Sequence, residues 1–146
     1  MTQDPSPPAT PRAVHRVLVI EDSDDIRDLT TMLISSYGHQ VSEAADGTTG
    51  LQAALDERPD VALVDIGLPG IDGFEVARRA REAIGDDIVL IALSGYGQVE
   101  DARKAREAGF DLHMVKPVDA SRLRKLLATE RSQLRAAVQA QAAPSS

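Results

Sequence analysis

Apolar residues gather in five short segments that are separated by longer stretches of mixed character. Two of these segments, Val61–Val64 and Ile88–Leu93, are uninterrupted apolar runs, which is typical of strands buried on both faces of a sheet. The other three are shorter or interrupted, but each also ends in polar residues or a turn. The pattern predicts five strands, at residues 14–20, 41–44, 61–65, 88–93 and 112–115.

The stretches between the predicted strands carry apolar residues at spacings of three and four, which predicts amphipathic helices. In the first, Ile26, Leu29, Leu33 and Tyr37 fall on one face, and Ser23 or Asp24 would cap it. Further helices are expected after Gly47, over residues 73–83 and 99–108, and from about Asp119. Because strands and helices alternate, we expect an α/β fold with a parallel sheet covered by helices on both faces.

The chain is expected to form one domain over residues 14–130. Residues 1–13 are rich in proline, serine and threonine, so we predict a disordered tail. Residues 131–146 are predicted to extend the last helix through Leu134 and Val138 before fraying. A long helix of this kind could pair with a second chain through Leu127 and Leu134, so a homodimer is one expectation to test.

The composition excludes several classes of function. The net charge of −7 argues against direct nucleic-acid binding, because phosphates would be repelled. The chain has no cysteine, which rules out disulfides, thiol catalysis and cysteine-ligated zinc. The longest apolar run is too short for a membrane span, and the proline-rich beginning is not a secretory signal, so we expect a cytoplasmic protein.

Chemically active residues stand where the predicted strands end. Glu21 and Asp22 follow the first strand, Asp65 ends the third, Ser94 follows the fourth and Lys116 follows the fifth. Ligands of open α/β sheets bind at this carboxyl edge. Clustered carboxylates favour Mg²⁺, while a lysine and a hydroxyl suit phosphoryl oxygens. With an aspartate as nucleophile, this set could carry out acyl-phosphate chemistry.

Simpler interpretations exist for single residues. An aspartate at the end of a strand, such as Asp65, is commonly a cap or a turn former. The acidic run from Glu21 to Asp25 could serve only the positive end of a helix, which explains Asp24 and Asp25 better than Glu21 and Asp22. The coincidence of matching residues at four strand ends favours a functional site.

These motifs resemble the receiver domain of two-component response regulators. The resemblance covers residues 16–129 and rests on Glu21-Asp22, the segment from Asp65 through Leu68-Pro69-Gly70-Ile71-Asp72-Gly73, Ser94, and Lys116-Pro117. It implies a flavodoxin-like (βα)5 fold with strand order 2-1-3-4-5. It also implies that Asp65 is the phosphoacceptor, assisted by Ser94 and Lys116.

The same resemblance assigns the metal ligands. Asp22 and Asp65 would bind Mg²⁺ directly, the carbonyl of Gly67 would be the third protein ligand, and Glu21 would act from the outer shell. Two positions depart from the common pattern: Glu21 stands where aspartate is more frequent, and His113 stands where tyrosine or phenylalanine is usual. His113 would be the switch residue that moves with Ser94, or else a half-exposed strand residue.

The resemblance implies a phosphorylation switch rather than an enzyme. A sensor histidine kinase or a histidine phosphotransfer protein would supply the phosphoryl group, and strand five with the last two helices would contact a downstream protein. The sequence ends without a DNA-binding or catalytic output domain, so we expect a stand-alone regulator or the receiver of a hybrid kinase.

Three other functions remain as alternatives. A Mg²⁺-dependent phosphohydrolase of the haloacid dehalogenase type should have a second aspartate two residues after the nucleophile, where this chain has Gly67. A nucleotide or flavin binder should have a phosphate loop in place of residues 21–25, whose charge repels phosphate. A degenerate receiver would act only as a scaffold, which the intact set of site residues argues against.

Overall fold

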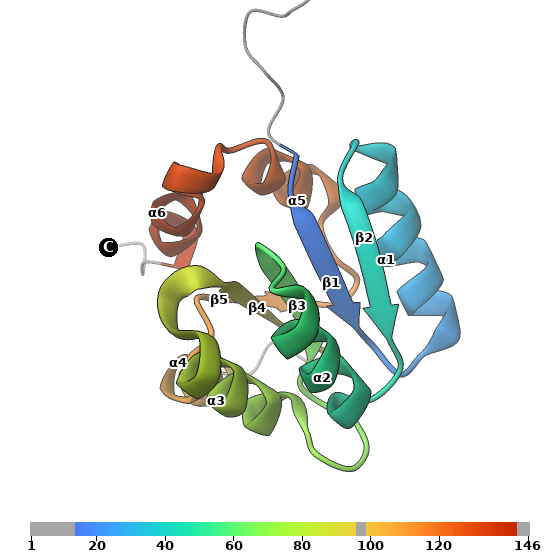
Figure 1. The fold of residues 1–146 in the computed structure, drawn as a ribbon, viewed down its shortest axis with the longest axis vertical. Coiled ribbons are helices and arrows are strands. Elements are labelled where there is room, and N and C mark those ends of the chain that lie inside the picture. The colour runs from blue at the N-terminus through green and yellow to red at the C-terminus, as the bar shows by residue number, and fades with distance from the viewer. Residues whose placement is uncertain (1–13, 96–98, 143–146) are drawn as a thin grey trace, which may run out of the picture.

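A five-stranded parallel sheet in the order β2-β1-β3-β4-β5 forms the centre of the protein (Figure 1). The computed structural model describes residues 14–95 and 99–142. The predicted fold class and strand order are therefore confirmed. The predicted disorder of residues 1–13 lies outside the described residues. Fraying was predicted for residues 139–146; residues 139–142 are instead helical, and residues 143–146 lie outside the described residues.

The elements alternate as the periodicity predicts. The strands are β1 (Arg16–Ile20), β2 (Gln40–Ala44), β3 (Val61–Asp65), β4 (Val89–Ser94) and β5 (Leu112–Val115). The helices are α1 (Asp24–Ser36), α2 (Gly47–Glu57), α3 (Gly73–Ile84), α4 (Val99–Ala108), α5 (Ala120–Leu127) and α6 (Arg131–Ala142), with a short 3-10 turn at Gly85–Asp87. All of the predicted strands lie within two residues of their expected bounds.

The register of the strands brings their carboxyl ends together. Ile20 in β1 lies beside Val64 in β3, and Asp65 lies beside Leu93 in β4. Ser94 in turn pairs with Val115, the residue before Lys116. Since all strands run parallel, the polar residues that follow them must share one edge of the sheet.

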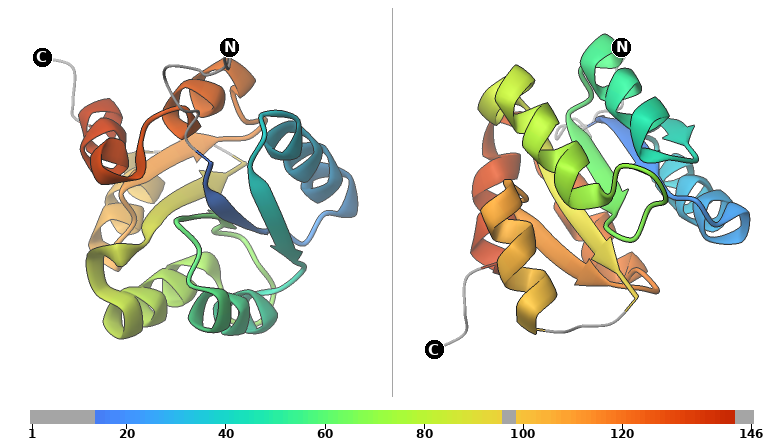
Figure 2. Two further views of the ribbon diagram at one scale, coloured as in Figure 1. Left: turned by 45° about the horizontal axis from the view of Figure 1, so that its top comes forward. Right: turned by 90° about the horizontal axis from the view of Figure 1, so that it is seen from below.

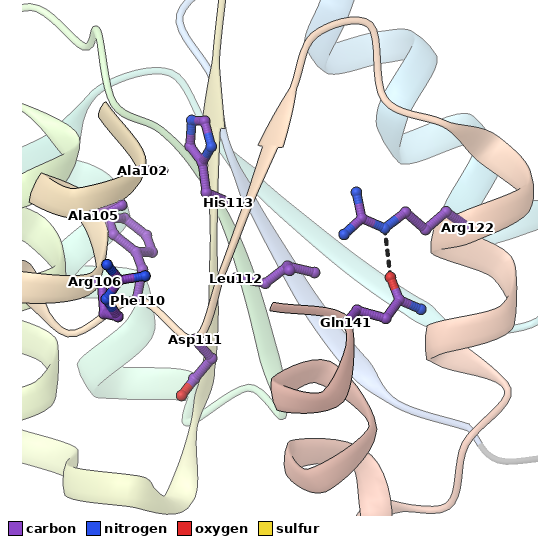
Figure 3. Close-up of a pocket in the computed structure, with 9 residues that line it drawn as sticks. All are labelled: Ala102, Ala105, Arg106, Phe110, Asp111, Leu112, His113, Arg122 and Gln141. Atoms are coloured by element: carbon purple, nitrogen blue, oxygen red, sulfur yellow. Dashed lines mark hydrogen bonds between the residues drawn. The ribbon is translucent and has the colours of Figure 1, made fainter. Parts of the chain in front are cut away.

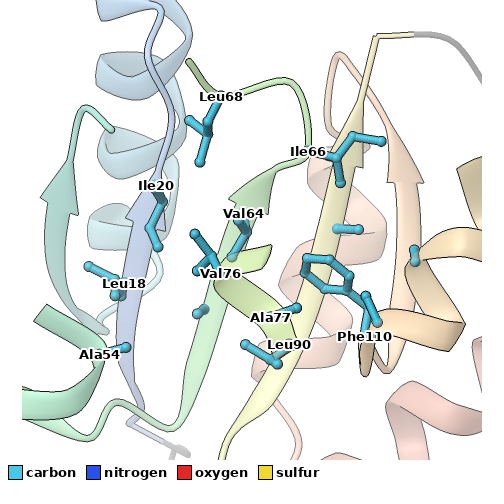
Figure 4. Packing of buried hydrophobic residues seen from close by; sticks show 14 of the residues in the cluster. Leu18, Ile20, Ala54, Val64, Ile66, Leu68, Val76, Ala77, Leu90 and Phe110 are labelled. Atoms are coloured by element: carbon cyan, nitrogen blue, oxygen red, sulfur yellow. The ribbon is translucent and has the colours of Figure 1, made fainter. Parts of the chain in front are cut away.

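Helices cover both faces of the sheet, as two further views show (Figure 2). On one face, apolar side chains of β1, β3 and β4 pack against α2, α3 and α4; Figure 4 shows Ile20, Val64 and Leu90 with Val76 and Ala77 of α3. On the other face, strand residues pack against α1, α5 and α6. Strand β3 is buried along its whole length because it is central and covered on both sides.

The inward face of α1 differs from the prediction. Leu29 is 56% exposed, whereas Thr30 and Ile34 are buried. Thr30 can face inward because its hydroxyl donates a hydrogen bond to the carbonyl of Ile26, 2.8 Å away, so no polar group is left without a partner. The helix is capped by Ser23, as expected.

The end of the chain is not a simple extension of α5. The chain turns after Leu127, and α6 folds back along β5. Leu127 and Leu134 are 0% and 2% exposed within this single chain. Leu127 and Leu134, which were predicted to pair with a second chain, thus belong to the protein's own core. The prediction that they pair with a second chain is wrong for this conformation.

Among the helices that the structure describes, none combines the length and apolar character needed to cross a membrane.

Candidate functional site

Asp65 is fixed at the carboxyl end of the central strand. Its side chain is 7% exposed. One carboxylate oxygen, Oδ1, accepts a hydrogen bond from the backbone N–H of Gly67 at 2.9 Å. The loop then returns so closely that a Cβ on Gly73 would lie 2.5 Å from the carbonyl oxygen of Asp65. Only glycine fits there, so the start of α3 holds the strand end in place.

Lys116 joins two of the carboxylates. Its Nζ lies 3.1 Å from Oε1 of Glu21 and 3.3 Å from Oδ2 of Asp65. The Lys116–Pro117 peptide bond is cis. The second oxygen of Glu21, Oε2, accepts the backbone N–H of Ser23 at 3.1 Å, so both oxygens of this buried carboxylate have partners.

Burial and the neighbouring charges change the pKa values of Glu21 and Lys116. Burial raises the pKa of Glu21 above the usual 4.5, and the negative charge of Asp65 adds to the rise, while Ser23 and Lys116 oppose it. For Lys116, burial works to lower the pKa, but the hydrogen bond to Glu21 and the charge of Asp65 prevail and raise it. Lys116 is therefore firmly a cation at neutral pH.

Three carboxylates converge at this edge. One oxygen each from Glu21, Asp22 and Asp65 lies within 4.8 Å of the others. Asp22 is exposed while the other two are buried, so the cluster opens to solvent on one side. A single lysine does not neutralise three carboxylates, and a set of hard oxygen ligands open to water suits a hydrated divalent cation.

Ser94 is buried at the end of β4 and contacts the neighbouring strand. Its Oγ lies 2.7 Å from Nε2 of His113 in β5. Burial lowers the pKa of His113, against a weaker opposing effect of Asp101, so the imidazole favours its neutral form. His113 is thus neither fully exposed nor isolated: it holds the serine hydroxyl.

A cavity of about 160 Å³ lies beside His113, between α4 and the α5–α6 pair. Figure 3 shows Phe110 and Leu112 along it, with Arg106 from α4 and Arg122 from α5 on its sides. The cavity does not include the carboxylate cluster; His113 lines the cavity and contacts Ser94.

One residue near the cluster has no counterpart in the sequence prediction. Arg27 of α1 donates to the backbone carbonyl of Glu21 at 2.8 Å and pairs with Asp24 and Glu43. It thereby ties the loop after β1 to α1 and β2. Its spacing of three from Asp24 signals a helical ion pair, but the contact with Glu21 depends on the folded loop.

The structure therefore brings together every residue predicted for the site. Glu21, Asp22, Asp65 and Lys116 form one cluster, and Gly67 touches Asp65 through its backbone N–H. The Ser94–His113 pair follows on the neighbouring strands. Their chemical roles are treated below as proposals.

Comparison with known proteins agrees with this geometry. A model of the response regulator receiver domain matches residues 17–128. Sporulation initiation phosphotransferase F of Bacillus subtilis is 32% identical over 109 residues, which are 75% of this chain and 87% of that protein. Transcriptional regulatory protein AfsQ1 of Streptomyces coelicolor is 41% identical over 102 residues, 70% of this chain, but the chain spans only 44% of that regulator.

Solved structures lead to the same group. A CheY-like receiver domain protein from Methanospirillum hungatei has a TM-score of 0.76 at 26% identity, covering 86% of this chain and 99% of that one. The chemotaxis protein CheY4 of Vibrio cholerae has a TM-score of 0.73 at 28% identity, covering 79% and 97%. The chain belongs to the receiver domain family of two-component response regulators.

Proposed function

We propose that Asp65 is the residue of this receiver that accepts a phosphoryl group, from a sensor histidine kinase or a histidine phosphotransfer protein. One observation carries the proposal: a largely buried carboxylate at a strand end lies 3.3 Å from a lysine ammonium and beside two further carboxylates. A carboxylate in this setting is fixed in position, and the neighbouring ammonium group can attract the oxygens of an incoming phosphoryl group.

The transfer needs few protein groups. A carboxylate oxygen of Asp65 attacks the phosphorus of a phosphohistidine, an O–P bond forms and the N–P bond breaks. The leaving imidazole takes its proton from solvent. Lys116 attracts the equatorial oxygens of the transferred group, and Gly67 holds Oδ1 of Asp65 by its N–H, so that the nucleophile enters the reaction with one orientation.

The carboxylate cluster fits Mg²⁺. We assign direct binding to Asp22, Asp65 and the carbonyl of Gly67. By the family resemblance, Glu21 acts from the outer shell, and its two oxygens contact Lys116 and the N–H of Ser23. When bound, the ion supplies positive charge that offsets the phosphoryl oxygens and the acidic cluster.

The Ser94–His113 pair is the proposed switch. A phosphoryl group on Asp65 offers oxygens that can accept the Ser94 hydroxyl, and Ser94 would then give up its 2.7 Å contact with His113. The imidazole is left beside a cavity with room to move. The change would reach a downstream protein through β5, α4 and α5.

Other assignments follow from the family rather than from the contacts. A cytoplasmic location and a Mg²⁺-dependent loss of the phosphoryl group by the receiver itself are part of the proposal. A homodimer, if it forms, must use a surface other than Leu127 and Leu134, because both are buried in the chain itself. The phosphohydrolase alternative is not favoured, since position 67 is glycine.

The test is phosphorylation by acetyl phosphate with Mg²⁺, read by intact mass. We expect the mass of one phosphoryl group on the wild type and none on Asp65→Asn or without Mg²⁺. Asp56→Asn is the matched control, because Asp56 is an exposed carboxylate that contacts only Gln52 among the described hydrogen bonds. It should be modified as the wild type is.

Small phosphodonors do not act on every receiver, so a second donor completes the test. A phosphorylated histidine phosphotransfer protein should label the wild type and the Asp56→Asn control. Labelling of Asp65→Asn at the wild-type level would show that another residue is the acceptor. No labelling by either donor would leave the scaffold alternative as the better account.

A further inference from the structure

The chain reverses direction between α5 and α6 although nothing in the local sequence requires a turn. Residues 118–143 contain no glycine and no proline. The three residues between the helices are Ala128, Thr129 and Glu130, and alanine and glutamate are good helix formers. Local preference alone would therefore carry one helix straight from α5 into α6.

The backbone follows that preference almost to the bend. Ala128 has φ −77° and ψ −11°, which is right-handed helical, and its N–H still bonds to the carbonyl of Arg124. Helices that end by local signals commonly do so with a left-handed glycine or asparagine. The end of α5 has no such signal, so contacts from elsewhere in the fold must impose it.

The first of these contacts comes from His15, which is 1% exposed just before β1. Its Nε2 lies 2.8 Å from the backbone carbonyl of Thr129, and since a carbonyl only accepts, the ring nitrogen donates. In a continuous helix this carbonyl would accept the N–H of Gln133. In the structure the N–H of Gln133 bonds instead to the carbonyl of Glu130. The hydrogen bond from His15 thus takes the place of one backbone hydrogen bond of a continuous helix.

The second contact comes from Asp60, just before β3. Its Oδ1 lies 3.0 Å from Nε of Arg131, the first residue of α6, and its Oδ2 accepts the N–H of Arg16 at 2.8 Å. His15 itself is held by stacking on His39, with ring centroids 5.3 Å apart. His15 therefore holds Thr129, within the bend, and Asp60 holds Arg131, the first residue after it.

Beyond the bend, α6 is attached to the sheet by few groups. Leu134 and Val138 are buried, and Arg135 pairs with the carboxylates of Asp111 at 2.8 Å and Asp86 at 3.3 Å. Arg135 also donates to the backbone carbonyls of Asp86 and Ile88. Near its end, the side chain of Gln141 accepts a hydrogen bond from Arg122 of α5, which Figure 3 shows across the gap between the two helices. The other side chains described in α6 are exposed or half-buried.

We propose that residues 128–130 form a hinge with two states, in which His15 and Asp60 hold α6 bent against β5 and their release joins α5 and α6 into one straight helix. The straight state would uncover Leu134 and Val138 together with the part of β5 that they cover. His15 and Asp60 are positioning residues in this device. The inference does not depend on phosphorylation at Asp65.

The two states differ greatly in one distance. Ser121 in α5 and Gln139 in α6 are both exposed, and the Arg122–Gln141 hydrogen bond keeps their helices side by side. In a straight helix, the 18 residue steps from Ser121 to Gln139 would span about 27 Å at 1.5 Å per residue. Because the chain has no cysteine, spin labels can be attached at Ser121→Cys and Gln139→Cys alone.

Electron paramagnetic resonance on this labelled pair is the test. We expect one short distance in the wild-type background and a second population near 27 Å, the length of the straight helix, in His15→Phe. Phenylalanine keeps the ring against His39 but removes the donor to Thr129. His15→Gln is the matched control, since its side-chain amide can donate from nearly the same place, and it should restore the short distance.

A proline variant separates straightening from simple fraying. Glu130→Pro cannot continue α5, because proline lacks the N–H and disfavours a helical residue before it. The double variant His15→Phe/Glu130→Pro should lose the population near 27 Å, the straight-helix distance. If that population persists in the double variant, or never forms in His15→Phe, the hinge is refuted.

A variant at an exposed residue guards against unfolding. Arg131→Gln removes the ion pair with Asp60. The Arg131 side chain is 73% exposed, so the fold should survive the change. The variant should produce the same long population at a lower level, with unchanged circular dichroism. A distance distribution identical to that of the wild type in both His15→Phe and Arg131→Gln would overturn the proposal.

Discussion

Replacing Lys116 by methionine removes the only lysine or arginine that pairs with Glu21 or Asp65 among the described ion pairs. The methylene stem is largely kept, so the packing changes little. Glu21 is 1% exposed, and without Lys116 its charge is left buried with only the N–H of Ser23 as a partner. Breaking a buried ion pair in this way costs about 3–5 kcal/mol, and the 16% exposure of Lys116 places the expected loss near the lower end.

The loss should depend on pH with a definite sign. Burial already raises the pKa of Glu21 in the wild type, and removing Lys116 raises it further. A carboxyl whose pKa is higher in the folded than in the unfolded state favours folding when protonated. The variant should therefore be close to the wild type near the unfolded pKa of 4.5, and its deficit should grow as the pH rises through the folded pKa.

Urea unfolding at a series of pH values measures this. Lys104→Met is the matched control, because Lys104 is an exposed lysine of α4 without a described ion pair, and it should change the free energy of unfolding by less than about 0.5 kcal/mol. Adding Mg²⁺ should recover part of the loss in Lys116→Met. Equal stability of Lys116→Met and the wild type at pH 8 would refute the reasoning that this ion pair balances the buried carboxylates.

Three further predictions use other parts of the structure. Gly73→Ala should destabilise the fold by at least about 1–3 kcal/mol in thermal unfolding and slow phosphorylation by acetyl phosphate, because its Cβ would press on the carbonyl of Asp65; normal values for both would contradict the close approach. Asp111→Asn should cost about 1.5–3 kcal/mol in urea unfolding, since this buried carboxylate pairs with Arg81 and Arg135 and accepts the N–H of Leu90, and a neutral result would show that these bonds contribute little. Burial lowers the pKa of both His39 and His113, so the unfolded chain takes up protons first and stability should fall as the pH drops below about 6.5; His39→Gln should flatten that slope in the urea midpoint.

The sheet was predictable because its signals are local. Each strand is marked by a short apolar run, and the alternation with helices leaves only a parallel sheet covered on both sides. The site followed from the same reasoning, since Asp65, Ser94 and Lys116 come directly at or after strand ends. The pattern does not show which side chains contact one another in the fold. Glu21 contacts Lys116 through one oxygen and Ser23 through the other, and both contacts depend on the folded loop.

The errors occur where long-range contacts overrule local preference. Periodicity placed Leu29 inside, but α1 is rotated so that Thr30 and Ile34 face the sheet, and the threonine hydroxyl is satisfied by its own helix. The chain after Leu127 reads as one helix because its residues favour one. At the bend, the carbonyl of Thr129 contacts His15, more than a hundred residues earlier, and no local pattern reveals that contact.

The contact between Ser94 and His113 affects how often the unphosphorylated receiver would adopt the active state. In the proposed switch, the serine must leave the imidazole before it can serve the phosphoryl group, and a hydrogen bond of this kind contributes about 1 kcal/mol. That corresponds to about a fivefold bias against spontaneous activation. A phenylalanine at position 113 could not hold the serine in this way, so in the proposed switch histidine would set a threshold against activation in the absence of a phosphoryl group.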